Sequence, residues 1–168
     1  MAVTVQNLGR VDGANNGVTR QYKVANGATV YVGEFVYLDQ STGRVTSASI
    51  AGKRLLGTVV GRDDAAYISG RTLATSATGD AGGTVTVLVD IEPQNRYLMK
   101  ADNVTNTLDE TDQGKYYNLI GSPGSQLVGM ASESTSSGQV VCLRTPVTIR
   151  GVDATYGLFK IVQSQLQQ

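Results

Sequence analysis

Short apolar segments separated by glycine-containing turns run along most of this chain, and this pattern restricts the fold more than any other feature. The chain has 20 glycines but only 3 prolines among its 168 residues. Asn26-Gly27 is a dipeptide typical of tight turns, and the segment 39–43 (DQSTG) is a second turn signal. The apolar segment between them and the returning segment 44–46 are rich in residues that favour strands. The pattern predicts a β-hairpin here and argues against long helices.

Two more segments carry clear strand signals. Residues 54–63 (RLLGTVVGRD) predict a strand in which Gly57 marks a bulge or a close approach of another backbone. Residues 84–93 (TVTVLVDIEP) alternate apolar and polar residues, and Leu88 adds apolar character to the second face. We therefore expect the 84–93 strand to be covered on both sides, with Pro93 ending it.

The second half of the chain continues this pattern with strands expected at 95–102, 116–120, 125–134, 138–152 and 157–165. Thr107 is a candidate cap for one short helix that ends at Gly114. Pro123-Gly124 matches the centre of a type II turn. The predicted fold class is all-β: a compact β-barrel or β-sandwich of about 8–10 short strands with one short helix.

The organisation expected from the sequence has three parts. Residues 1–22 are read as an extended N-terminal arm, although an ordinary first strand at 3–8 is the alternative. Residues 23–152 form the β-rich domain, either as one unit or as two packed sub-barrels meeting near residue 93. Residues 153–168 supply a C-terminal strand and a polar tail. A long loop rich in small residues is expected at 63–83.

The sequence offers little catalytic chemistry. It contains no histidine, which removes the commonest general base and transition-metal ligand. Its one cysteine, Cys142, lies in an apolar segment and is interpreted as a buried small hydrophobe. The acidic residues at 109–112 suit a helix start, and the segment 121–126 (GSPGSQ) lacks the helix that a phosphate-binding loop needs. We expect no enzymatic activity, no cofactor and no metal.

Charge and hydropathy also limit the partners. Fourteen basic residues balance 14 acidic ones, so we expect no direct nucleic-acid binding. No apolar run approaches the roughly 18 to 20 residues that span a bilayer, so we expect no membrane insertion and synthesis in the cytoplasm. Basic residues dominate 1–60 and acidic residues dominate 101–135, which raises the hypothesis that one end of the molecule attracts the other end of a neighbour.

The order of segments resembles that of small head decoration, or cement, proteins of tailed bacteriophages. An early glycine-containing arm precedes VANGATVYVGEFVYLDQSTGRV, and a strand similar to RYLMKAD follows. A short helix then leads into GKYYNL, a glycine-rich turn and a closing strand ending in PVTIRGV. The resemblance covers roughly residues 20–152 and is one of pattern and order.

What the resemblance implies is a structural protein on the outer surface of the mature virion. Such a protein clamps neighbouring major capsid subunits, commonly as a homotrimer at threefold and quasi-threefold positions. Its expected partners are the major capsid protein of the same phage and other copies of itself. Candidate capsid or subunit contacts, taken from the arm, the long loop and the segment near 116, are Val3, Val5, Leu8, Arg10, Arg20, Tyr67, Ile68, Arg71, Lys115, Tyr116 and Tyr117.

A different class of function stays open at this point. A head-fibre or tail-fibre adhesin, or another glycan-binding β module, would carry a groove lined with tyrosines. The candidates for that groove are Tyr67, Tyr97, Tyr116 and Tyr117.

Overall fold

The computed structural model describes residues 18–48, 53–62, 76–92, 94–102, 108–145 and 155–162, together with the backbone of residues 5–10. Within these residues the chain forms thirteen strands and one 3-10 turn, η1. Their bounds are β1 Val5–Arg10, β2 Thr19–Lys23, β3 Thr29–Tyr31, β4 Phe35–Asp39, β5 Arg44–Ser47, β6 Gly57–Arg62, β7 Ser76–Thr78, β8 Thr86–Asp90, β9 Asn95–Lys100, η1 Glu110–Asp112, β10 Tyr116–Ser122, β11 Ser125–Ser134, β12 Val140–Arg144 and β13 Tyr156–Ile161.

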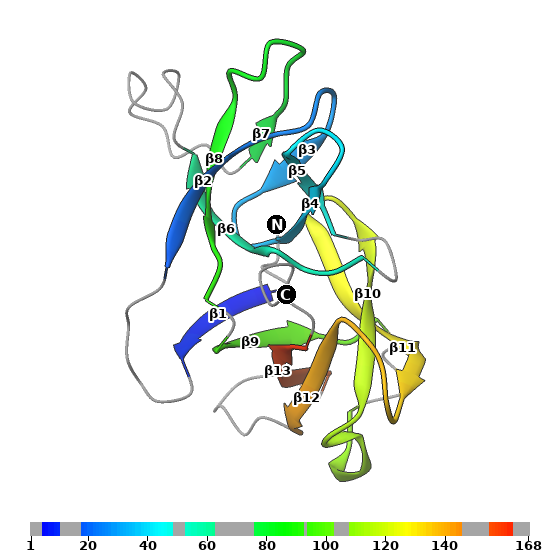
Figure 1. Ribbon diagram of the computed structural model, residues 1–168. Coiled ribbons are helices and arrows are strands. Elements are labelled where there is room, and N and C mark those ends of the chain that lie inside the picture. The colour runs from blue at the N-terminus through cyan, green and yellow to red at the C-terminus, as the bar shows by residue number, and fades with distance from the viewer. Residues whose placement is uncertain are drawn as a thin grey trace.

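The strands form three antiparallel sheets, so the all-β prediction is confirmed (Figure 1). A five-stranded sheet has the order β2-β8-β6-β4-β5, and a six-stranded sheet has the order β1-β9-β13-β12-β10-β11. The third sheet is the β3–β7 pair. There are more strands than the eight to ten expected, because strands as short as β3 and β7 are too brief to produce a recognisable alternation.

Neither large sheet is closed into a barrel, although each curls back on itself at one point. In the five-stranded sheet, Val24 forms an isolated parallel bridge with Val45. In the six-stranded sheet, Ala101 forms one with Val128. Next to that bridge, the Asp102 N–H donates to the Val128 carbonyl. These bridges occupy part of the backbone that an edge strand would otherwise expose.

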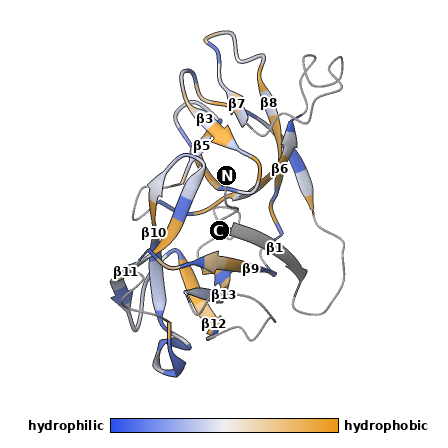
Figure 2. Cartoon of the chain, turned by 180° about the vertical axis from the view of Figure 1, so that it is seen from behind, coloured by the Kyte–Doolittle hydropathy of each residue, from blue (hydrophilic) through white to orange (hydrophobic). Residues whose placement is uncertain are grey.

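The hydrophobic core has two parts, and β4 faces both of them. Val36 belongs to a cluster inside the five-stranded sheet, whereas Phe35 belongs to a cluster inside the six-stranded sheet. The ring of Phe35 packs edge-to-face on Tyr97 of β9, with 4.7 Å between the centroids. Because successive side chains of a strand point to opposite faces, β4 fastens the two sheets together. Figure 2 shows hydrophobic residues along strands of both sheets and hydrophilic residues around η1.

The individual strand predictions have mixed outcomes. The hairpin after Asn26-Gly27 is confirmed as β4 and β5, and Gly57 does mark a close approach, because a Cβ there would lie 2.0 Å from the Asp90 carbonyl oxygen. The prediction that 84–93 is buried on both faces is only half right, since Leu88 is half-buried. Residues 76–78 of the expected loop form β7, which pairs with β3. Residues 63–75, Pro93 and the segment 146–154 lie outside the described residues.

The expected helix is a single 3-10 turn, and its cap differs from the prediction. Asp109, rather than Thr107, is the N-cap, and Thr107 lies outside the described residues. Gly114 follows the turn with φ of 86°, a left-handed conformation that glycine adopts without strain. The prediction that Gly114 ends the helical segment is therefore confirmed.

Candidate functional site

The 3-10 turn is held by two reciprocal side-chain hydrogen bonds. The backbone N–H of Thr111 donates to the Asp109 carboxylate at 2.7 Å, and the Asp109 N–H donates to the Asp112 carboxylate at 2.7 Å. The bonds from Thr111 hold the pKa of Asp109 below its ordinary value. This arrangement is a capping box in which two orphan N–H groups of the turn are satisfied. The acidic residues at 109–112 thus shape a turn.

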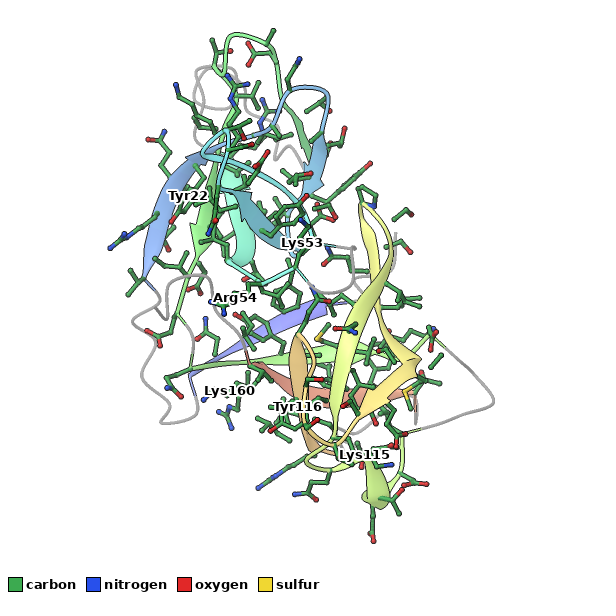
Figure 3. The ribbon with its side chains drawn as sticks, turned by 45° about the vertical axis from the view of Figure 1, so that its right-hand side comes forward. Tyr22, Lys53, Arg54, Lys115, Tyr116 and Lys160 are labelled. Atoms are coloured by element: carbon green, nitrogen blue, oxygen red, sulfur yellow. The ribbon has the colours of Figure 1, made fainter. Side chains whose placement is uncertain are left out.

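Asp112 is buried and connects this turn to β10. Its second oxygen accepts a hydrogen bond from the Tyr117 hydroxyl at 2.7 Å and pairs with Lys115 at 3.3 Å. Lys115 also forms an ion pair with Glu133 at 2.8 Å, and this bond, more than the one with Asp112, raises the pKa of the lysine. Figure 3 shows Lys115 at the end of the molecule that carries the turn. The lysine therefore joins β10 to β11 and is charged at neutral pH.

The adjacent tyrosines of β10 point to opposite faces of the strand, as alternation predicts. Tyr117 is completely buried and packs edge-to-face against Phe159, whereas Tyr116 is half-buried. Burial and the bond to Asp112 raise the pKa of Tyr117. Tyr117 is therefore a core residue, which corrects its place among the contact candidates. Of the pair, Tyr116 is the residue with side-chain surface for a partner.

Cys142 is buried in the same region. Its backbone carbonyl accepts from the Gly114 N–H at 2.8 Å, and its N–H donates to the Lys115 carbonyl at 2.9 Å. Burial, with a smaller contribution from Asp112, raises the pKa of the thiol to about 12. A thiol with so little thiolate is a poor nucleophile. The interpretation of Cys142 as a buried small hydrophobe is confirmed.

The N-terminal candidates lie partly in strands of their own chain. β1, which spans Val5, Leu8 and Arg10, pairs antiparallel with β9, so this part of the expected arm is an edge strand of the six-stranded sheet. Arg20 is exposed on β2. The remaining candidates lie outside the described residues; they are Val3, Tyr67, Ile68 and Arg71.

Two exposed valines, Val32 and Val60, adjoin a pair of hydrogen-bonded residues next to the β3–β4 turn. The Gly33 N–H donates to the Val59 carbonyl at 2.7 Å, and Val32 and Val60 are the sequence neighbours of these two bonded residues. Their exposed fractions are 44% and 45%. Val18, at 46%, is exposed to the same degree but lies before β2. We call Val32 and Val60 the valine patch.

A buried polar joint connects the two large sheets on one side of Phe35. The side chain of Gln126, on β11, accepts from the Phe35 N–H at 2.8 Å and donates to the Phe35 carbonyl at 2.8 Å. It also donates to the Ser47 hydroxyl at 3.1 Å. Gln126 is only 1% exposed. The amide thus completes the backbone hydrogen bonding at the start of β4.

Glu34 extends this joint to the tip of the β10–β11 hairpin. Its carboxylate accepts from the backbone N–H groups of Tyr31 and Gly124, both at 2.9 Å. The Ser47 hydroxyl donates to it at 3.4 Å. Gly124 has φ of 79°, as the second central residue of a type II turn requires, so the predicted Pro-Gly turn is confirmed. The turn directs the Gly124 N–H toward Glu34, which directly precedes β4 of the five-stranded sheet. The turn tip is therefore a docking element between the sheets.

A second polar group lies on the far side of Phe35. Asn95 donates to the Asp90 carboxylate at 2.8 Å, and both side chains are buried. Asp90 lies opposite Thr58 in the β6–β8 ladder, and Thr58 lies opposite Phe35. Burial, followed by the charge of Asp90, raises the pKa of Tyr97. Polar groups therefore flank the Phe35–Tyr97 contact on both sides.

Sequence reasoning missed the joint. Gln126 bonds Phe35, 91 positions away, and Glu34 bonds Gly124, 90 positions away, and nothing in an isolated glutamine signals such a contact. The detectable signal was Glu34 itself, a carboxylate within an apolar segment. Such a residue must find hydrogen-bond donors if it is buried.

The tyrosine-lined groove expected for a glycan-binding module does not form from the predicted residues. Tyr97 and Tyr117 are fully buried, and Tyr67 lies outside the described residues. Within the described part of the chain, no group of three or more histidine, cysteine, aspartate or glutamate side chains is arranged to hold a metal ion. No helix among the described residues is long and apolar enough to cross a membrane.

Comparison with known proteins gives no match to a protein-family model, a curated protein sequence or a solved structure.

Proposed function

We propose that this chain is a head decoration, or cement, protein of a tailed bacteriophage. It binds the outer surface of the mature capsid and clamps neighbouring major capsid subunits, as a homotrimer at threefold and quasi-threefold positions. The order of its segments, which resembles that of such proteins, supports this assignment. The protein is made in the host cytoplasm and ends on the virion.

The observation that carries the proposal is that the ionisable and nucleophilic side chains named above make structural contacts within the fold. Lys115 and Asp112 hold a turn to a sheet, Tyr117 is buried against them, and Cys142 is a buried thiol. Glu34 and Gln126 hold the two sheets together. Polar and ionisable side chains that bond to one another inside the fold make it rigid. A rigid fold suits a protein that works by presenting a fixed surface to a partner.

The valine patch is the surface that we assign to the capsid contact. Scattered exposed apolar side chains are ordinary, but these two flank one hydrogen bond and sit beside the joint. A copy that binds only the expanded lattice stabilises that lattice by linkage. Repetition over all equivalent positions multiplies a modest contact into stability of the whole shell.

The test is binding to capsids that lack their decoration protein. Purified protein should sediment with expanded, mature heads and stay in solution with unexpanded ones. The double variant Val32→Asp/Val60→Asp should lose at least tenfold in affinity, because a desolvated carboxylate at the contact is costly. Val18→Asp is the matched control and should bind like the original protein. Failure of the unmodified protein to bind mature heads would remove the proposed function.

The oligomeric state provides a second, independent check. Size-exclusion chromatography with light scattering should give the mass of a trimer, either in solution or after release from the capsid. A protein that stays monomeric in both conditions argues strongly against the trimeric arrangement.

A further inference from the structure

Glu34 is a buried carboxylate with no cation facing it among the described residues. It is 4% exposed, and its acceptor bonds come from the N–H groups of Tyr31 and Gly124 and from the Ser47 hydroxyl. The segments around it are 31–35, 45–48, 57–60 and 122–126. Glu34 is their only charged residue, and the Tyr31 phenol is the only other titratable side chain. No charged side chain of the described residues is among the groups that shift its pKa.

Burial without a counter-charge favours the protonated form of a carboxyl. Desolvation is the largest influence on the Glu34 pKa and raises it above its ordinary value of 4.5. The bonds from the Gly124 and Tyr31 N–H groups oppose this shift but do not cancel it. The ionised form of Glu34 is therefore the costly one in the closed joint.

Opening of the hairpin tip would remove that cost. The tip contributes the Gly124 N–H, and the Gly124 backbone also lies against the ring of Tyr31. When the tip moves away, water reaches the carboxylate, and its proton affinity falls toward that of an exposed glutamate. The open state therefore prefers ionised Glu34, whereas the closed state prefers the protonated side chain.

We propose that Glu34 makes the joint between the two sheets proton-sensitive, so that the β10–β11 tip is held more tightly on acidification and loosens as pH rises. Below pH 4.5 both states carry the proton, and the closed joint has its full stability. Between 4.5 and the raised value, the closed state binds more protons than the open state, so the closed joint loses stability as pH rises. Above the raised value, the loosening is complete and no longer changes with pH.

The first measurement uses the unmodified protein. Carbon NMR of the Glu34 carboxyl should show a titration midpoint above 4.5. Amide hydrogen exchange should show that the protection factor of the Gly124 N–H falls as pH rises, by up to about tenfold per pH unit while Glu34 titrates. The Gln139 N–H, which donates to the Tyr117 carbonyl within the six-stranded sheet, is the control and should keep a constant protection factor.

The variant Glu34→Gln supplies the second measurement, because its side chain does not titrate. The Gly124 protection factor should then be independent of pH, while the exposed-residue control Glu110→Gln should behave like the original protein. A Glu34 midpoint at or below 4.5 would overturn the proposal, as would an equal decline of Gly124 protection in Glu34→Gln. If Glu34→Gln does not fold, the carboxyl titration of the unmodified protein decides the matter alone.

Discussion

At the residue scale, Gln126 does for Phe35 what the backbone of a neighbouring strand would do. Its amide oxygen and nitrogen satisfy the N–H and the carbonyl of the same residue. Buried backbone groups without partners are costly, so the first residue of β4 depends on a side chain from the other sheet. This side chain is therefore one of the contacts that hold the two sheets together.

Replacement of Gln126 by methionine, which keeps the length of the side chain but not its polarity, should lower the free energy of unfolding. The buried Phe35 N–H loses its acceptor, whereas the Phe35 carbonyl still accepts from the Ala48 N–H, so we expect a loss of about 1–3 kcal/mol. Urea unfolding followed by circular dichroism measures it. Gln113→Met, at an exposed position, is the control and should change little. An equal effect of both substitutions would contradict the role of the amide.

Asp112 is the second residue on which several contacts converge. Asp112→Ala removes the acceptor of the buried Tyr117 hydroxyl and one half of the capping box. We expect a loss of about 2–4 kcal/mol of unfolding free energy. Glu110→Ala, an exposed residue of the same turn, should cost less than about 0.5 kcal/mol. Thermal unfolding of the two variants side by side tests this, and similar melting temperatures would count against it.

At the scale of the element, β6 shows why two glycines in one strand are not equivalent. A Cβ at Gly57 would lie 2.0 Å from the Asp90 carbonyl oxygen on β8, but a Cβ at Gly61 would meet nothing within 4 Å. The register of the β6–β8 ladder shifts between Val59 and Gly61. The close approach at Gly57 is therefore a requirement of the ladder, whereas Gly61 lies in open space beyond the shift.

Alanine substitutions at Gly57 and Gly61 should differ clearly in their effect on the free energy of unfolding. Gly57→Ala forces the β8 backbone away and should cost about 2 kcal/mol or more, as overpacking does. Gly61→Ala should change stability by less than about 1 kcal/mol, since the restricted unfolded chain offsets small losses. Urea midpoints of the two variants provide the measurement. A Gly57→Ala protein as stable as the original would show that the ladder tolerates a wider spacing.

At the scale of the whole molecule, the acidic block of the linear sequence is accompanied by basic residues from neighbouring strands. In the described residues from 94 onward, five acidic residues share their part of the molecule with five basic ones; the basic residues are Arg96, Lys100, Lys115, Arg144 and Lys160. Four of these basic residues lie on β9, β12 and β13 of the six-stranded sheet, and Lys115 directly precedes β10 of the same sheet. The hypothesis that one end of the molecule attracts the other end of a neighbour stays a prediction, and it now has to account for these basic residues.

The two large sheets should unfold together. Phe35, Ala48 and Leu55, from the first part of the chain, belong to the same buried cluster as Tyr97 and Tyr117. Hydrogen exchange followed by mass spectrometry across a urea series should give one midpoint for peptides from β6–β8 and from β10–β13. Two separated midpoints would indicate two independent folding units. In Gln126→Met the midpoints should begin to diverge, because the joint is weakened.

The sequence by itself determined the class of structure and much of its local geometry. Alternating apolar residues dictate strands because side chains of a strand point to opposite faces, and the same rule assigns Tyr116 and Tyr117 to different faces of β10. Gly114 and Gly124 were recognisable because left-handed backbone is open to glycine at little cost. Signals of this kind depend only on neighbours in the chain.

Only the tertiary structure decided which strands pair and what the buried polar residues do. The joint brings Gln126 to Phe35 across 91 positions and Glu34 to Gly124 across 90. The cap of the 3-10 turn is Asp109, and its partner Asp112 also accepts a hydrogen bond from Tyr117. A polar side chain can satisfy many different donors and acceptors, so its partner depends on which backbone groups the packed sheets leave open. The alternation of apolar and polar residues can be recognised in the local sequence. Hydrogen bonds between distant segments form only once the chain has folded.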